Sequence, residues 1–134
     1  MTLYDGAELK RRFVEATDFA AFHEYYFSNF VERGNFKRLG RMLSAPRSKF
    51  LNRALAQSYS EAAGVSPVIV SSRFIEIPEL GLIHGALDVN GKLASVLYFD
   101  DIAMGMFVVV ENSATSELKY MRFTVTRPSP GKPN

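Results

Sequence analysis

The sequence contains no cysteine, and this absence removes several kinds of chemistry at once. Without thiols the chain has no disulfide, no thiolate metal ligand and no cysteine nucleophile. It also lacks any apolar run close to the ~20 residues that cross a bilayer. Residues 1–10 already carry charges, so we expect no signal peptide and a cytoplasmic protein.

Common signatures of catalysis and cofactor binding are missing as well. The chain has no Gly-x-Ser-x-Gly nucleophile elbow, no glycine-rich phosphate loop and no dinucleotide-binding fingerprint. Its two histidines, His23 and His84, stand far apart in a chain without cysteine, which does not make a zinc site. We therefore expect both histidines to be structural, and the protein to be a non-enzyme without metal or cofactor.

What is present is the composition of a globular protein. The 134 residues are 47% hydrophobic and 22% charged, enough for one domain with a real core. We predict a single α+β domain over residues 1–126, in which three to four N-terminal helices pack on a four- or five-stranded antiparallel meander sheet. Residues 127–134 contain three prolines, which lack a backbone donor, and predict a disordered tail.

Helix-ending and helix-starting residues divide the first half of the chain. Gly34 and Gly64 suit the left-handed position that follows a helix, whereas Asn35 can cap a helix and Pro46 fits a first turn. Apolar residues recur at helical spacing between these points. The helices are expected at about residues 3–16, 19–33, 36–43 and 46–63.

In the second half the pattern changes to short β-branched runs. Asn90-Gly91 is the preferred pair for a type I′ turn, and a two-residue hairpin loop there places Leu87 opposite Ala94. Such runs lie at about residues 68–70, 74–77, 82–89, 92–99, 104–110 and 118–125, and together they predict four or five antiparallel strands.

Both faces of this predicted sheet are substantially apolar. Residues 106–110 are apolar without alternation, which is typical of a strand covered on both sides. The helices can cover one face, so the second face needs further helix, a ligand or another copy of the chain. We expect a homodimer through the sheet.

The net charge of +2 conceals a basic segment between Glu32 and Glu61. Seven bases follow one another there without an acid: Arg33, Lys37, Arg38, Arg41, Arg47, Lys49 and Arg53. Two neighbouring helices could present them as one face that binds phosphates, anionic lipid or an acidic protein. The alternative is a solvated surface whose bases pair with acids of the sheet. The candidate partner-binding residues are Lys37, Arg38, Arg41, Lys49 and Arg53.

The second predicted helix is rich in aromatic residues. It contains Phe19, Phe22, Tyr25, Tyr26, Phe27 and Phe30, which cover more than one helical stripe. Such residues pack a core most often, but they can also stack on bases or line a ligand pocket. If a pocket lies between this helix and the sheet, we expect Phe22, Tyr26 and Phe30 to line it.

Acidic residues near the last strands suggest a third possibility. Tyr98 with Asp100 and Asp101 looks like the Tyr-x-Asp-Asp hairpin of polymerase palms, where two carboxylates bind Mg²⁺. The later Glu117-Leu-Lys119 is similar to the core of the PD-(D/E)xK nucleases, although here no helix follows it. These resemblances imply a metal-dependent phosphodiesterase.

The sequence thus supports three hypotheses for the function, which we rank as follows. The first is a small, dimeric, non-catalytic binding or regulatory module whose basic face takes nucleic acid or an acidic protein. The second is a small-ligand domain with the aromatic pocket, and the third is the phosphodiesterase.

Overall fold

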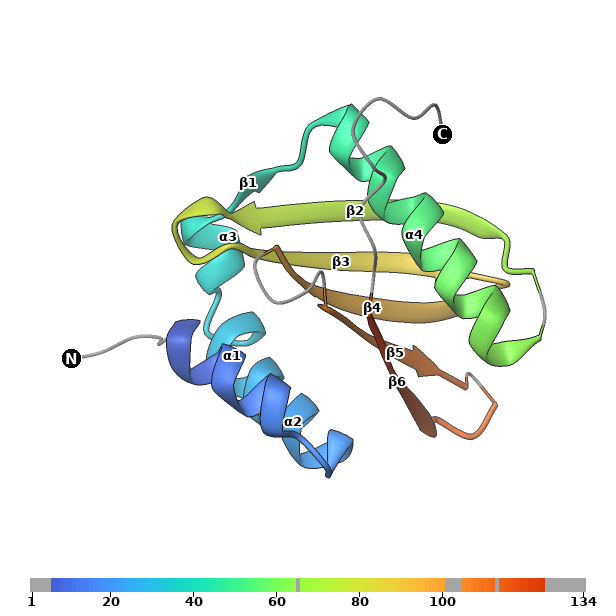
Figure 1. Cartoon of the computed structure of the whole chain (residues 1–134), viewed down its shortest axis with the longest axis horizontal. Coiled ribbons are helices and arrows are strands. Elements are labelled where there is room, and N and C mark those ends of the chain that lie inside the picture. The colour runs from blue at the N-terminus through green and yellow to red at the C-terminus, as the bar shows by residue number, and fades with distance from the viewer. Residues whose placement is uncertain (1–5, 65, 101–104, 113, 125–134) are drawn as a thin grey trace.

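The computed structural model describes residues 6–64, 66–100, 105–112 and 114–124, and Figure 1 shows their arrangement. Asp101 and the expected tail at 127–134 lie outside these ranges. The described helices are α1 (Gly6–Glu15), α2 (Phe19–Tyr26), the π-helical turn η1 (Phe27–Val31), α3 (Asn35–Leu39), α4 (Ala45–Ala63) and the short 3-10 turn η2 (Pro78–Leu80). No helix among the described residues is both long and apolar enough to cross a membrane.

The described strands form one antiparallel sheet in sequential order, β1 to β6. They are β1 (Arg41–Met42), β2 (Ile69–Ile77), β3 (Leu82–Val89), β4 (Lys92–Phe99), β5 (Gly105–Glu111) and β6 (Leu118–Thr124). The predicted α+β class with a meander sheet is confirmed. The sheet has six strands rather than four or five, because two residues expected in a helix form β1.

The third helix is shorter than predicted and starts differently. Gly34, with φ of 73°, occupies its N-cap position, so Asn35 is the first helical residue and not the cap. The helix ends at Leu39 because Gly40 is extended, with φ −84° and ψ 162°. A Cβ atom on Gly40 would collide with the carbonyl oxygen of Phe36 and the side chain of Ile75, so glycine is required where α3 meets the sheet.

The predicted β-hairpin is confirmed together with its register. Asn90 and Gly91 both have positive φ, 56° and 80°, as a type I′ turn requires. Leu87 lies opposite Ala94, as the two-residue loop implies. The Asn90 side chain also accepts a hydrogen bond from the Val68 amide at 2.7 Å, which ties the start of the neighbouring strand to this turn.

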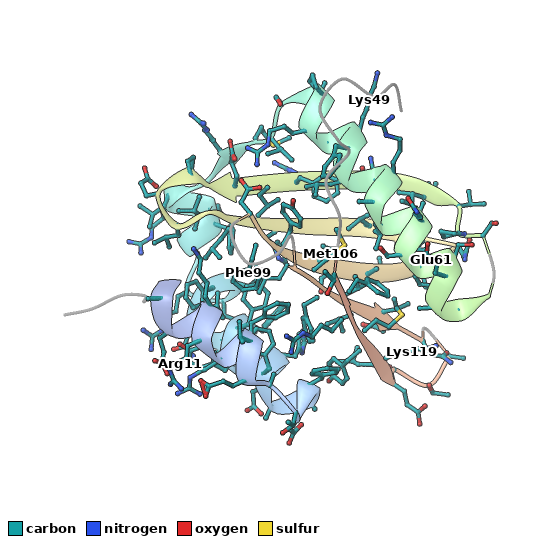
Figure 2. The ribbon with its side chains drawn as sticks, viewed as in Figure 1. Arg11, Lys49, Glu61, Phe99, Met106 and Lys119 are labelled. Atoms are coloured by element: carbon teal, nitrogen blue, oxygen red, sulfur yellow. The ribbon has the colours of Figure 1, made fainter. Side chains whose placement is uncertain are left out.

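Helices pack on both faces of the sheet, whereas the sequence suggested that they cover one. Leu51 and Leu55 of α4 join the core of one face, which includes Met106. Phe13 of α1 joins the core of the other face, which includes Phe99. Figure 2 shows Phe99 beside α1 and Met106 towards α4. This arrangement explains why residues 106–110 are all buried.

The chain changes faces at β1. From α3 it passes along the outer edge of β2, where Arg41 and Met42 pair with Glu76 and Ile75. It then enters α4, which lies across the strands in Figure 1. Residues of the basic segment therefore follow one edge of the sheet instead of one helical face.

Candidate functional site: a basic rim at the sheet edge

The five candidate partner-binding bases lie on three consecutive elements. We call this set the basic rim; it consists of Lys37 and Arg38 on α3, Arg41 on β1, and Lys49 and Arg53 on α4. All five residues are exposed. A helix over residues 36–43 would have placed Lys37 and Arg41 on one helical face, but this expectation is wrong because α3 ends at Leu39.

Lys49 and Arg53 keep the predicted spacing of four residues on α4. Together with Pro46 and Asn52 they line a surface hollow of about 470 Å³. The Asn52 amide donates to the Ser72 hydroxyl at 3.1 Å, which fixes one wall of the hollow to β2. Two bases thus border one concave surface, the shape that a ligand group can enter.

A buried carboxylate binds two arginines at the edge of the sheet where the basic rim lies. Glu76, only 6% exposed, accepts hydrogen bonds from Arg41 Nε at 3.0 Å and from Arg47 Nη1 at 2.6 Å. Arg47 also bonds Asp100 through Nη2 at 2.9 Å. A buried charge is costly unless it is paired, so these arginines are needed by Glu76. Arg41 and Arg47 therefore tie β1, β2, α4 and the end of β4 together.

This network is the pairing that the solvated-surface alternative predicted, but it includes only part of the basic segment. Within the ranges that the structure describes, Lys37, Lys49 and Arg53 form no ion pair. The first turn of α4 contains no acid, and the Ser44 side chain makes no capping hydrogen bond. The positive end of the helix dipole therefore adds to the charge of the rim.

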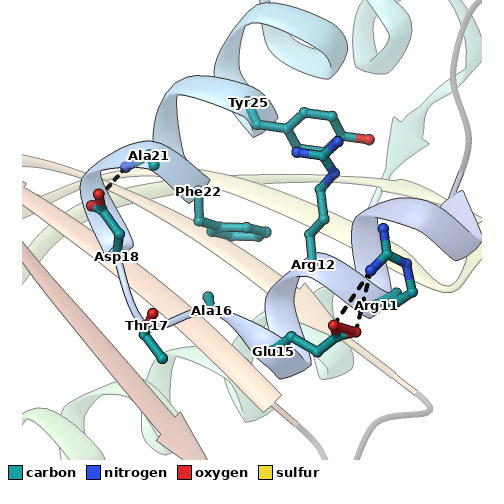
Figure 3. Close-up of a pocket in the computed structure, with 9 residues that line it drawn as sticks. All are labelled: Arg11, Arg12, Glu15, Ala16, Thr17, Asp18, Ala21, Phe22 and Tyr25. Atoms are coloured by element: carbon teal, nitrogen blue, oxygen red, sulfur yellow. Dashed lines mark hydrogen bonds and ion pairs between the residues drawn. The ribbon is translucent and has the colours of Figure 1, made fainter.

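The three candidate pocket residues are core residues. Phe22, Tyr26 and Phe30 are buried against the sheet in the core that contains Phe99. Phe22 also borders a hollow of about 280 Å³ on the outer side of α2, between α2 and α1. Figure 3 shows this groove, with the Arg12 guanidinium 4.0 Å from the centre of the Tyr25 ring. The groove that the structure offers near Phe22 thus lies between two helices.

A hydrogen bond between Tyr26 and His84 is buried in the same core. The Tyr26 hydroxyl contacts His84 Nδ1, and the Phe36 ring lies 5.4 Å from the imidazole, centre to centre. Burial lowers the pKa of His84 to about 4 and raises the pKa of Tyr26 well above its usual value. Both groups are therefore neutral at pH 7, and the tautomer of His84 determines which of the two donates. Sequence reasoning missed this pair, because 58 residues separate its members.

His23 lies elsewhere in that core, half-buried between the Phe27 and Tyr120 rings. Burial lowers its pKa. Among the described residues no group of three histidine or acidic side chains is arranged to hold a metal ion.

The residues proposed for a phosphodiesterase are not brought together. Asp100 follows β4, whereas Glu117 precedes β6 at the other end of the sheet. Val110 pairs with both Ala94 and Lys119, so six strand residues separate the level of Lys119 from Asp100. At ~3.3 Å per residue this is roughly 20 Å. Asp101 lies outside the described residues.

Comparison with known proteins finds no matching family model, curated sequence or solved structure for this chain.

Proposed function

We propose that the protein is a cytoplasmic, non-catalytic binding module that holds an anionic partner, nucleic acid in the first instance, on its basic rim. The observation that carries this proposal is the hollow lined by Lys49 and Arg53, two bases with no acidic partner in the described structure. An unpaired base costs little in water but gains free energy when it neutralises a phosphate and releases counterions.

The distribution of charge supports a partner that is extended and charged along its length. The rim runs from α3 through β1 to α4, so its bases are spread along an edge and do not converge on one point. Arg41 and Arg47 join β1 and α4 to β2 through their ion pairs with Glu76. The remaining bases, Lys37, Lys49 and Arg53, are then available to successive phosphates.

The test is fluorescence anisotropy of labelled DNA and RNA against the purified protein over a range of salt concentrations. Three to five phosphate contacts predict that affinity for duplex DNA falls roughly 40- to 500-fold between 50 and 200 mM salt. Absence of binding at 50 mM salt, or binding that does not change with salt, would contradict the proposal.

An acidic protein is the second candidate partner, and a specific observation favours it. Leu39 and Met42, which lie within the rim, are 42% and 61% exposed. Protein interfaces use such apolar anchors, whereas phosphate contacts do not need them. Leu39→Ser combined with Met42→Ser should therefore leave DNA affinity unchanged, while it should weaken capture of an acidic protein partner.

The α1–α2 groove supports a small-ligand function as a separate alternative. Phe22 lines this groove, and the stacked Arg12 and Tyr25 side chains line it as well. A ligand retained there would appear as added mass in native mass spectra of the purified protein, and Ala21→Trp would remove it by filling the groove. Retention by Ala21→Trp would exclude this groove.

The proposal includes a homodimer, because in the described structure Leu93 and Leu118 are 67% and 38% exposed on the sheet face that carries α1 and α2. Two copies would also double the number of bases offered to one polymer.

A further inference from the structure

The two edges of the sheet are protected to different degrees. An edge strand presents unpaired N–H and C=O groups, which can pair with another chain. At the β2 edge, β1 pairs with Glu76 and Ile75, and a register shift between Ile69 and Ser71 interrupts the strand further along. At the other edge, β6 pairs with β5 over seven residues without a shift and contains no proline. In the described structure no strand lies on the outer side of β6, so this edge is open.

The hydrogen-bond pattern identifies the residues of β6 whose backbone faces outward. The Asn112 amide donates to the Glu117 carbonyl oxygen at 2.8 Å, so these two residues face each other as a hydrogen-bonded pair. Such pairs alternate along an antiparallel ladder. Lys119 and Met121 therefore direct their backbone groups to β5. The groups that face away from β5 belong to Leu118, Tyr120, Arg122 and Thr124.

These outward-facing residues are self-complementary about Met121. When two β6 strands run antiparallel with Met121 opposite its own copy, Leu118 lies opposite Thr124 and Tyr120 lies opposite Arg122. Each outward-facing residue then meets another, and every such pair exchanges two hydrogen bonds. A shift of the register by two residues in either direction leaves Leu118 or Thr124 without a partner in β6.

The charges of β6 do not oppose this pairing. Lys119 of one copy would stand four residues along the strands from Lys119 of the other, or roughly 13 Å. This separation exceeds the Debye length of about 8 Å at physiological salt. The Arg122 guanidinium turns back to its own α1, where it lies 4.6 Å from the centre of the Phe13 ring and donates to the Val14 carbonyl oxygen at 3.4 Å.

The helices leave room for a second copy at this edge. Phe22 of α2 packs over β5, with its ring centre 5.0 Å from that of Phe107. Once the β6 strands are paired, the two β5 strands are three strand spacings apart, about 14 Å, whereas a helix with its side chains is about 10–12 Å wide. On the other face, both ends of α4 connect to the opposite edge of the sheet, through β1 and β2.

We propose that β6 pairs antiparallel with β6 of a second copy, about a two-fold axis that passes through Met121 perpendicular to the sheet. This inference rests on the proposed function, since it specifies the interface of the homodimer included there. The contact uses the same residues of both copies and closes after two. It removes the open edge and gives Leu118, which is 38% exposed, a neighbouring strand. The two basic rims then lie at the far ends of one continuous sheet.

A thiol at the axis tests this register directly, because the chain has no cysteine. In the proposed pairing the two copies of Met121 form a non-hydrogen-bonded pair, whose Cα atoms are about 4.5 Å apart, within the range of a disulfide. Met121→Cys under mild oxidation should therefore give a disulfide-linked dimer in high yield on a non-reducing gel. Lys119→Cys is the matched control on the same sheet face, and it should stay largely unlinked because its two copies are roughly 13 Å apart.

This control is the stricter because random collisions favour it. Lys119 is exposed, whereas Met121 is only 8% exposed, so unspecific oxidation would link Lys119→Cys first. Equal or preferential linkage at Lys119→Cys would overturn the proposal. A Met121→Cys variant that is folded by circular dichroism and yet stays unlinked would overturn it as well.

Light scattering coupled to size exclusion is a second measurement, which leaves the core unchanged. Wild-type protein should be a dimer at micromolar concentrations. Leu118→Pro removes an outward-facing N–H at the first residue of β6, where proline is tolerated, and so removes two hydrogen bonds from the symmetrical interface. It should raise the dimer dissociation constant roughly tenfold or more, whereas Leu118→Ala keeps the N–H and the dimer. A monomeric wild type at about 100 μM, or equal dissociation constants for the two variants, would contradict the interface.

These measurements use no nucleic acid, and β6 lies at the edge opposite the basic rim. A dimer without affinity for DNA would overturn the proposed binding function alone. A monomer that binds DNA would overturn the β6 interface alone.

Discussion

At the scale of single residues, the burial of His84 makes the stability of the fold depend on pH. The pKa of His84 is about 4 in the folded protein, because burial disfavours its charged form, and 6.5 without that burial. As pH falls below 6.5 the unfolded chain takes up a proton that the folded chain excludes. This group should therefore lower the free energy of unfolding by up to about 3 kcal/mol as pH falls from 6.5 to 4.

Urea denaturation at pH 7 and at pH 4.5 measures this dependence. His84→Gln should lose most of the difference, and His23→Gln, at the less buried histidine, should keep it. The same pH dependence in His84→Gln and wild type would show that other groups are responsible.

Gly40 is the second residue with an individual consequence. Because a Cβ atom there would meet the backbone of Phe36 and the side chain of Ile75, Gly40→Ala forces α3 away from β2. We expect a loss of about 1–3 kcal/mol in the free energy of unfolding, as for other overpacked sites. Urea denaturation checks this, and a change below ~0.5 kcal/mol would mean that the junction adjusts freely.

At the scale of elements, two helix starts that look alike in the sequence behave differently. Asp18 caps α2 by accepting a hydrogen bond from the Ala21 amide at 3.1 Å, whereas the Ser44 side chain makes no such bond at α4. Asp18→Ala should therefore cost about 1 kcal/mol and Ser44→Ala only a few tenths. Thermal denaturation of the two variants compares them directly, and equal losses would show that Ser44 caps α4 in solution.

The bounds of an element could be predicted where a single local feature determines the backbone conformation. Asn90-Gly91 determined the hairpin and its register, and Gly34 and Gly64 both adopt the left-handed conformation that ends a helix. The third helix was predicted too long because Leu43 fits a helical stripe, yet it pairs with Phe74 through its backbone amide at 3.2 Å. The periodicity of a short segment does not reveal such a partner.

At the scale of the whole molecule, the sequence did not reveal on which face each helix packs. An apolar stripe on a helix is the same whether it covers the near or the far side of a sheet. The chain passes from one face of the sheet to the other at β1, whose two residues are too few to show a strand pattern. Glu76 of β2 fixes this passage through its ion pairs with Arg41 and Arg47. The basic segment was therefore found in the sequence, while its division into paired and unpaired bases required the fold.

The proposed function depends on the basic rim as a binding surface. In Figure 2 Lys49 and Lys119 stand on different sides of the molecule, which provides a matched comparison. Lys49→Gln with Arg53→Gln removes two charges from the rim, and Lys92→Gln with Lys119→Gln removes two exposed charges elsewhere. Neither pair touches the network around Glu76.

The decisive measurement is the salt dependence of DNA affinity for these two double variants, read by fluorescence anisotropy. The rim variant should lower the slope of log affinity against log salt by about 2, because each lost phosphate contact removes ~0.9. The control variant should keep the wild-type slope. Equal slopes for the rim variant and wild type, or an equal loss in the control, would contradict binding at the rim.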